Sequence, residues 1–135
     1  MTMAPVEQAV AMRAAFDAIE EAYEFMLAYA AQGRKDEAAD GGQGGESQIR
    51  QYLKRFRAAL DDLRGAASPR LGGPEGDVYS QRFLADLDVM KSVLDLLMAQ
   101  ASISSDMIDN TNGLVAVRAF LTNVFFVDQA VLPRR

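Results

Sequence analysis

The chain has 135 residues, of which half are apolar and 24% are charged, so we expect residues 1–135 to form a single folded domain with one core. Its formal net charge of −5 argues against general binding to nucleic acid or to anionic membranes. Because the sequence has neither cysteine nor histidine, it excludes disulfides, thiolate nucleophiles, zinc-thiolate sites, imidazole bases and histidine-ligated haem.

The first predicted element is an amphipathic helix over residues 5–32. Its apolar residues recur at alternating intervals of three and four, as on the buried side of a helix: Ala9, Met12, Phe16, Ile19, Tyr23, Met26 and Ala30. Residues 33–45 hold five glycines and no large apolar residue. Such a stretch has little to bury and much backbone entropy to lose, which predicts a flexible loop.

Two further helices follow with the same apolar spacing. One covers residues 46–66, with Ile49, Leu53, Phe56, Leu60 and Leu63 on its buried side. A loop rich in glycine and proline is expected at 67–76. The next helix is expected over 77–104, with Asp77 as its N-cap.

A fourth helix is predicted over residues 105–132, but its start is open to two interpretations. Ser102–Asp106 offers cap residues for a start near 105, whereas Asn110–Gly113 is a rival turn that would place the start near 112. We favour the first, because it gives helices of similar length. The fold class expected is all-α, an antiparallel up-and-down four-helix bundle.

The fourth helix is unusually apolar. Between Leu114 and Leu132 only Arg118 and Asp128 are ionic, and the apolar surface is wider than the roughly 100° needed to pack on a single core. We expect a central helix or a protein-binding helix. The residues predicted to bind a partner are Val115, Arg118, Thr122, Phe125, Phe126 and Gln129. A transmembrane span is not expected, because Arg118, Asn123 and Asp128 would lie at three depths of the bilayer.

A basic strip lies on the second helix. Arg50, Lys54, Arg57 and Arg64 follow one another at intervals of four, three and seven, so they share a face. This strip is a possible site for an acidic partner. The alternative is a solvated face whose charges pair with acids of the same chain.

No catalytic, cofactor-binding or metal-binding residue is predicted. The carboxylates lie off the apolar sides of their helices, the serines have no nearby base to activate them, and the glycines match no phosphate-binding loop. One alternative function is binding of an apolar small molecule in the core, among Phe16, Tyr23, Met26 and Met90. A weaker alternative is an enzyme whose carboxylates bind a metal.

The function expected is therefore a non-enzymatic protein-protein interaction module. We expect an adaptor, chaperone or assembly factor that docks through its apolar C-terminal helix and forms a homodimer. The N-terminal residues contain no basic stretch followed by an apolar one, so no secretory signal is expected and we predict a cytoplasmic protein.

Overall fold

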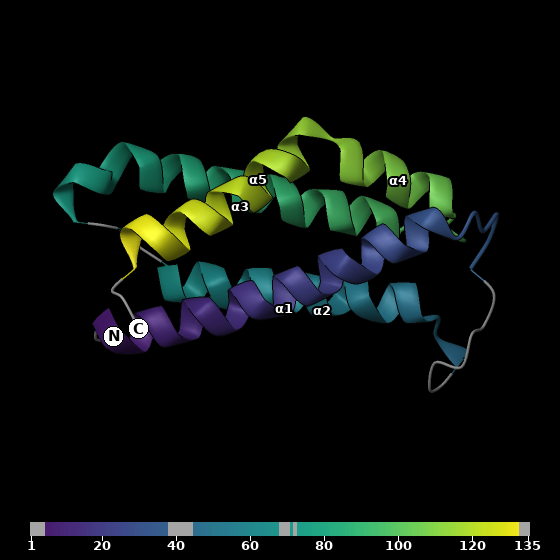
Figure 1. Cartoon of the computed structure of the whole chain (residues 1–135), viewed down its shortest axis with the longest axis horizontal. Helices are drawn as coiled ribbons and strands as arrows, with labels where there is room; N and C mark the ends of the chain where they lie inside the picture. Colours follow the sequence, from purple (N-terminus) through teal and green to yellow (C-terminus); the bar gives the residue numbers. More distant parts are fainter. Residues whose placement is uncertain (1–4, 38–44, 68–70, 72, 133–135) are drawn as a thin grey trace.

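A computed structural model describes residues 5–37, 45–67, 71 and 73–132 (Figure 1). The prediction of an all-α fold is confirmed, because every regular element within these ranges is helical. The α-helices are α1 Pro5–Ala31, α2 Gln48–Ala67, α3 Asp77–Met98, α4 Ser105–Gly113 and α5 Val115–Phe126. A short 3-10 turn, η2 (Pro74–Gly76), precedes α3, and a π-helical turn, η3 (Val127–Val131), follows α5.

The helices lie in two layers (Figure 1). Helices α1 and α2 run side by side in opposite directions and pack extensively on each other, and α3, α4 and α5 form the other layer. Helix α3 contacts both α2 and α5, while α4 contacts α1. The largest side chains enclosed between the layers include those of Tyr29, Phe56, Phe83 and Phe120.

The first two predicted helices agree with the structure to within two residues at each end. The third begins at residue 77 as predicted, although Asp77 is its first residue and Gly76 is the cap. It ends at Met98, six residues earlier than predicted. Beyond this point the carbonyl groups of Met98 and Gln100 accept hydrogen bonds from the Arg50 side chain, so they need no helical N–H partner.

The prediction of one continuous fourth helix over 105–132 is wrong. Helix α4 begins where we favoured, with the Ser104 hydroxyl accepting a hydrogen bond from the backbone N–H of Met107. It ends at Gly113, because Leu114 adopts an extended conformation with φ −62° and ψ 133°. The chain then turns by 62° into α5. Both sequence signals therefore operate: the cap residues of Ser102–Asp106 start α4, and the turn Asn110–Gly113 ends it.

Parts of both predicted loops lie outside the described residues. These parts are residues 38–44 of the loop at 33–45, and residues 68–70 and 72 of the loop at 67–76. In the described remainder, Gly33 has a φ of +67°, a conformation that glycine adopts without steric cost.

Gly76, at the start of α3, is expected to tolerate no side chain. A Cβ atom there would lie 2.1 Å from the carbonyl oxygen of Leu71, and backbone cannot swing away as a flexible side chain would. Replacing Gly76 by alanine should lower the free energy of unfolding by about 1 to 3 kcal/mol. Gly65 is the matched control, because it lies in α2 with nothing within 4 Å of the added Cβ.

At Gly65, alanine should be neutral or stabilising by up to about 1 kcal/mol, because it lowers the backbone entropy lost in the helix. Urea unfolding followed by circular dichroism would measure both variants. Equal stability of the two alanine variants would contradict the close approach of Leu71 to Gly76.

Candidate functional site

Helix α5 is held in place by its inner face. Val117, Phe120, Leu121 and Val124 are buried in the core. The ring of Phe120 stacks on that of Phe83, with 5.8 Å between the ring centroids, so α5 is held against α3.

A second set of contacts joins α3 to α5. The Tyr79 hydroxyl donates a hydrogen bond of 2.7 Å to Oδ1 of Asn123. Burial, together with the charge of Asp86, raises the pKa of Tyr79, which keeps the donor proton in place. The rings of Tyr79 and Phe126 pack edge to face, with 5.2 Å between their centroids.

All six residues predicted to bind a partner are exposed on the outside of α5 and η3. Val115 is 83% exposed, and Phe125 and Phe126 are 55% and 51% exposed. Between them lie the polar residues Arg118 and Thr122, with the Thr122 hydroxyl donating to the Arg118 carbonyl at 2.8 Å. Part of the apolar surplus of this helix thus faces solvent, while the rest fills the core.

The π-helical turn η3, which carries Gln129, is fastened to α1. Asp128 in η3 accepts a hydrogen bond from Nε of Arg13 on α1, at 2.8 Å. A second bond, of 3.4 Å, runs from the Arg13 guanidinium to the Asp128 carbonyl. These contacts fasten the C-terminal end of α5 to α1 and leave Gln129 exposed.

Sequence reasoning missed a second group of exposed apolar residues, which lies on α3. Val78 is 81% exposed, Val89 47% and Leu96 66%. They are spaced so as to share one side of the helix, opposite the buried residues Phe83, Leu87, Met90 and Leu94. The same periodicity search that found the inner side would have found this one.

The basic strip on α2 is paired within the chain. Each of its four basic residues forms an ion pair: Arg50 with Glu37, Lys54 with Glu46, Arg57 with both Asp61 and Asp95, and Arg64 with Asp88. These acids come from α2, α3 and the residues between α1 and α2. The strip therefore joins α2 to its neighbours, and an acidic partner would have to displace acids already bound.

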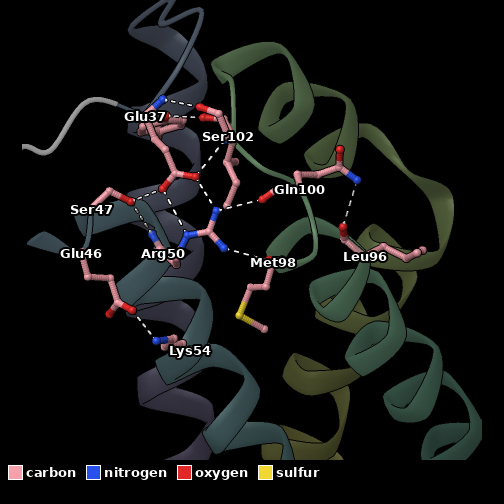
Figure 2. Close-up of polar contacts among 11 residues, drawn as sticks. Glu37, Glu46, Ser47, Arg50, Lys54, Leu96, Met98, Gln100 and Ser102 are labelled. Atoms are coloured by element: carbon pink, nitrogen blue, oxygen red, sulfur yellow. Dashed lines mark hydrogen bonds and ion pairs between the residues drawn. The ribbon is translucent and has the colours of Figure 1, made fainter.

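Arg50 is at the centre of a connected polar cluster (Figure 2). Its guanidinium donates to Glu37 at 2.5 Å and 3.3 Å, and to the carbonyls of Met98 at 2.8 Å and Gln100 at 3.1 Å. The Glu37 carboxylate also accepts from the Ser47 hydroxyl and from the backbone N–H of Ile103. We call these groups the Glu37–Arg50 cluster.

This cluster joins three parts of the chain at one end of the fold. The Glu37 side chain is 10% exposed and that of Arg50 is 21% exposed. Burial alone would raise the pKa of Glu37, but the hydrogen bonds from Arg50 and Ser47 and the charge of Arg50 lower it below its ordinary value of 4.5. An ion pair that is largely shielded from solvent and hydrogen-bonded to Ser47, Met98, Gln100 and Ile103 serves structure, so we assign this cluster no ligand.

The residues considered for an apolar ligand are packed into the protein. Phe16, Met26 and Met90 are each at most 3% exposed, and Tyr23 is half-buried against the core. None of these four residues lines the surface hollow between α1 and α2 or the one beside Arg50. Among the described residues, no three carboxylates come together as metal ligands would.

No single helix in the described ranges is long and apolar enough to cross a membrane. Only α4 and α5 with η3, taken together across their 62° bend, reach the length and composition of a span.

The chain matches no protein-family model, and comparison with curated proteins and with solved structures finds no match. The function proposed below is therefore argued from the chain's own residues.

Proposed function

We propose that this chain is a non-enzymatic protein-protein interaction module that docks through the outer side of α5. In this proposal α4 and α5 together take the place of the fourth helix of an antiparallel bundle, with the exposed residues Val115, Phe125 and Phe126 as the binding surface. An adaptor, a chaperone or an assembly factor in the cytoplasm would use a surface of this kind.

The observation that supports the proposal is that α5 exposes large apolar side chains although its inner side already fills the core. Exposed apolar patches on folded domains mark interaction surfaces more often than an isolated exposed leucine does. Aromatic residues are also enriched at protein interfaces, where they bury a large area at low entropic cost. Two phenylalanines and Val115 on one short helix fit that composition, and Arg118 between them adds a polar contact.

Replacing Val115 by aspartate tests this surface without disturbing the core. Val115 is the first residue of α5, where an acidic side chain interacts favourably with the helix dipole, so the variant should stay folded. A partner that covers α5 would bury the new carboxylate without a counter-charge, which is costly, so we expect binding to weaken by about 100-fold or more. Affinity capture from the native host and sedimentation of the purified chain would measure association.

Val6 gives the matched control for this variant. It is 70% exposed and lies in the first turn of α1, which is not part of the proposed docking surface, so aspartate there should leave association unchanged. If the Val115→Asp protein retains every partner of the wild type, α5 is not the docking surface.

Binding of an apolar ligand remains the second candidate function, and native mass spectrometry would detect its mass on the purified chain.

A further inference from the structure

Two connecting segments lie side by side at the end of the protein where α1 and α3 end and α2 and α4 begin (Figures 1 and 2). One segment follows α1 and the other leads into α4. The backbone N–H of Ser105 donates to the Arg34 carbonyl at 2.8 Å, and the N–H of Arg34 donates to the Ser105 hydroxyl, also at 2.8 Å. The N–H of Glu37 donates to the Ser102 hydroxyl at 3.0 Å. We call these two segments, residues 34–37 and 102–105, the latch.

Side chains fasten the latch to its neighbours from two directions. The Glu37 carboxylate accepts a hydrogen bond of 3.0 Å from the N–H of Ile103, and it is also bound by Arg50 of α2. From α1, the Tyr29 hydroxyl donates to the Ile103 carbonyl at 2.6 Å. The Ser105 hydroxyl donates to the Tyr29 carbonyl at 2.7 Å. These fastening contacts are hydrogen bonds and an ion pair, and they bind both backbone groups of Ile103.

The latch adds little apolar surface to the core. Residues 34–37 are all charged, and residues 102–105 are three serines and Ile103, whose side chain is buried. Helix α5, by contrast, buries several apolar side chains and stacks Phe120 on Phe83. Opening the latch would therefore break polar contacts and expose one large apolar side chain, whereas detaching α5 would expose many more apolar atoms.

We infer that the latch opens as one unit while the rest of the protein stays folded, and that Glu37 keeps it closed. Segments that bury few apolar contacts are the ones that open locally in folded proteins. Glu37 holds the facing segment at two points, because its backbone N–H binds Ser102 and its carboxylate binds Ile103. The start of α4 can move without carrying α5 along, since Leu114 is extended and the chain turns by 62° between these helices. The inference is independent of the docking proposed for α5.

Single cysteine probes test this inference, because the sequence contains no cysteine of its own. Ile103→Cys places a thiol in the latch, and Ile19→Cys places a matched thiol at the centre of α1, since both isoleucines are 0% exposed. A buried thiol reacts with an aromatic disulfide reagent only when the chain around it opens. At low reagent concentration the labelling rate then follows the population of the open form. Both probes would be measured in the full chain over a urea series, with circular dichroism to verify folding.

We expect Ile103→Cys to be labelled at least about tenfold faster than Ile19→Cys, and with a weaker dependence on urea, because a local opening exposes little surface. Adding Glu37→Gln should speed the labelling of Ile103→Cys by about tenfold or more, since charge-assisted hydrogen bonds are lost. Adding Val124→Ala, a core change in α5, should speed the labelling of Ile19→Cys by about tenfold and leave that of Ile103→Cys unchanged. The reason is that Val124 stays packed when the latch alone opens.

Equal labelling rates with the same urea dependence at both probes would show that the latch opens only with the whole protein, which would overturn the inference. An equal acceleration of both probes by Val124→Ala would overturn it as well. If Glu37→Gln leaves the labelling of Ile103→Cys unchanged, Glu37 is not the residue that keeps the latch closed. None of these results bears on docking through α5, which Val115→Asp tests separately.

Discussion

Replacing Phe120 by alanine is expected to lower the free energy of unfolding by about 3 to 5 kcal/mol, the largest effect of any single change considered for this chain. The Phe120 side chain is completely buried and stacks on Phe83 across the contact between α5 and α3. Its removal leaves a cavity that the surrounding helices can close only in part. Since single domains are stable by only about 5 to 15 kcal/mol, much of the fold's stability would be lost.

Phe125 is the control for this prediction, because it lies on the same helix five residues later. It is 55% exposed, so alanine there should cost about 1 kcal/mol or less in a monomeric protein. Urea unfolding monitored by circular dichroism would compare the two variants. A loss of similar size at both positions would show that α5 is not oriented with Phe120 inward.

Replacing Arg50 by methionine is expected to lower the free energy of unfolding by roughly 2 to 4 kcal/mol, because it leaves the largely buried Glu37 carboxylate without its cation. The carbonyl groups of Met98 and Gln100 would lose their donors in the same change. Arg55 is the control on the same helix. It is exposed and its guanidinium lies 4.9 Å from the centre of the Tyr52 ring, so its replacement by methionine should cost no more than about 1 kcal/mol.

The Glu37–Arg50 cluster also gives a dependence of stability on pH. Because the pKa of Glu37 is lower in the folded chain than in the unfolded chain, its contribution is present above the ordinary value of 4.5 and is lost as pH falls through the folded value. Glu37→Gln should therefore cost stability at pH 7, and the difference from the wild type should shrink below about pH 4.5. Unfolding in urea at several pH values would measure this, and a difference that stays constant down to pH 3 would contradict it.

Helix boundaries were predictable where local signals act alone. Apolar spacing located α1 and α2 to within two residues, because both helices are long and have one buried side. The early end of α3 was not predictable from local signals, because the Met98 carbonyl accepts its hydrogen bond from Arg50, which lies 48 residues away in sequence. The break at Leu114 was visible in the sequence as a turn signal at Asn110–Gly113. We treated this turn and the cap residues near 105 as alternatives, although both operate.

Part of the candidate site was predictable from the sequence, because an excess of apolar residues is a local signal. The excess of apolar residues on α5 pointed to a surface, and the structure places Val115, Phe125 and Phe126 there. The apolar outer side of α3 was overlooked because one buried side sufficed to explain the helix. Pairing of Arg50 with Glu37 could not be foreseen, because the two residues are brought together by the turn of the chain between α1 and α2 and no spacing rule links them.

The Glu37–Arg50 cluster has a consequence for the order in which the chain folds. Helices α1 and α2 are neighbours in sequence, so their pairing closes a short loop, whereas the hydrogen bond from Ile103 to Glu37 closes one of 66 residues. Contacts that close long loops are made late in folding. This end of the protein should therefore assemble after α1 and α2 have paired, and amide hydrogens of residues 99–104 should exchange with solvent sooner than those at the centre of α1.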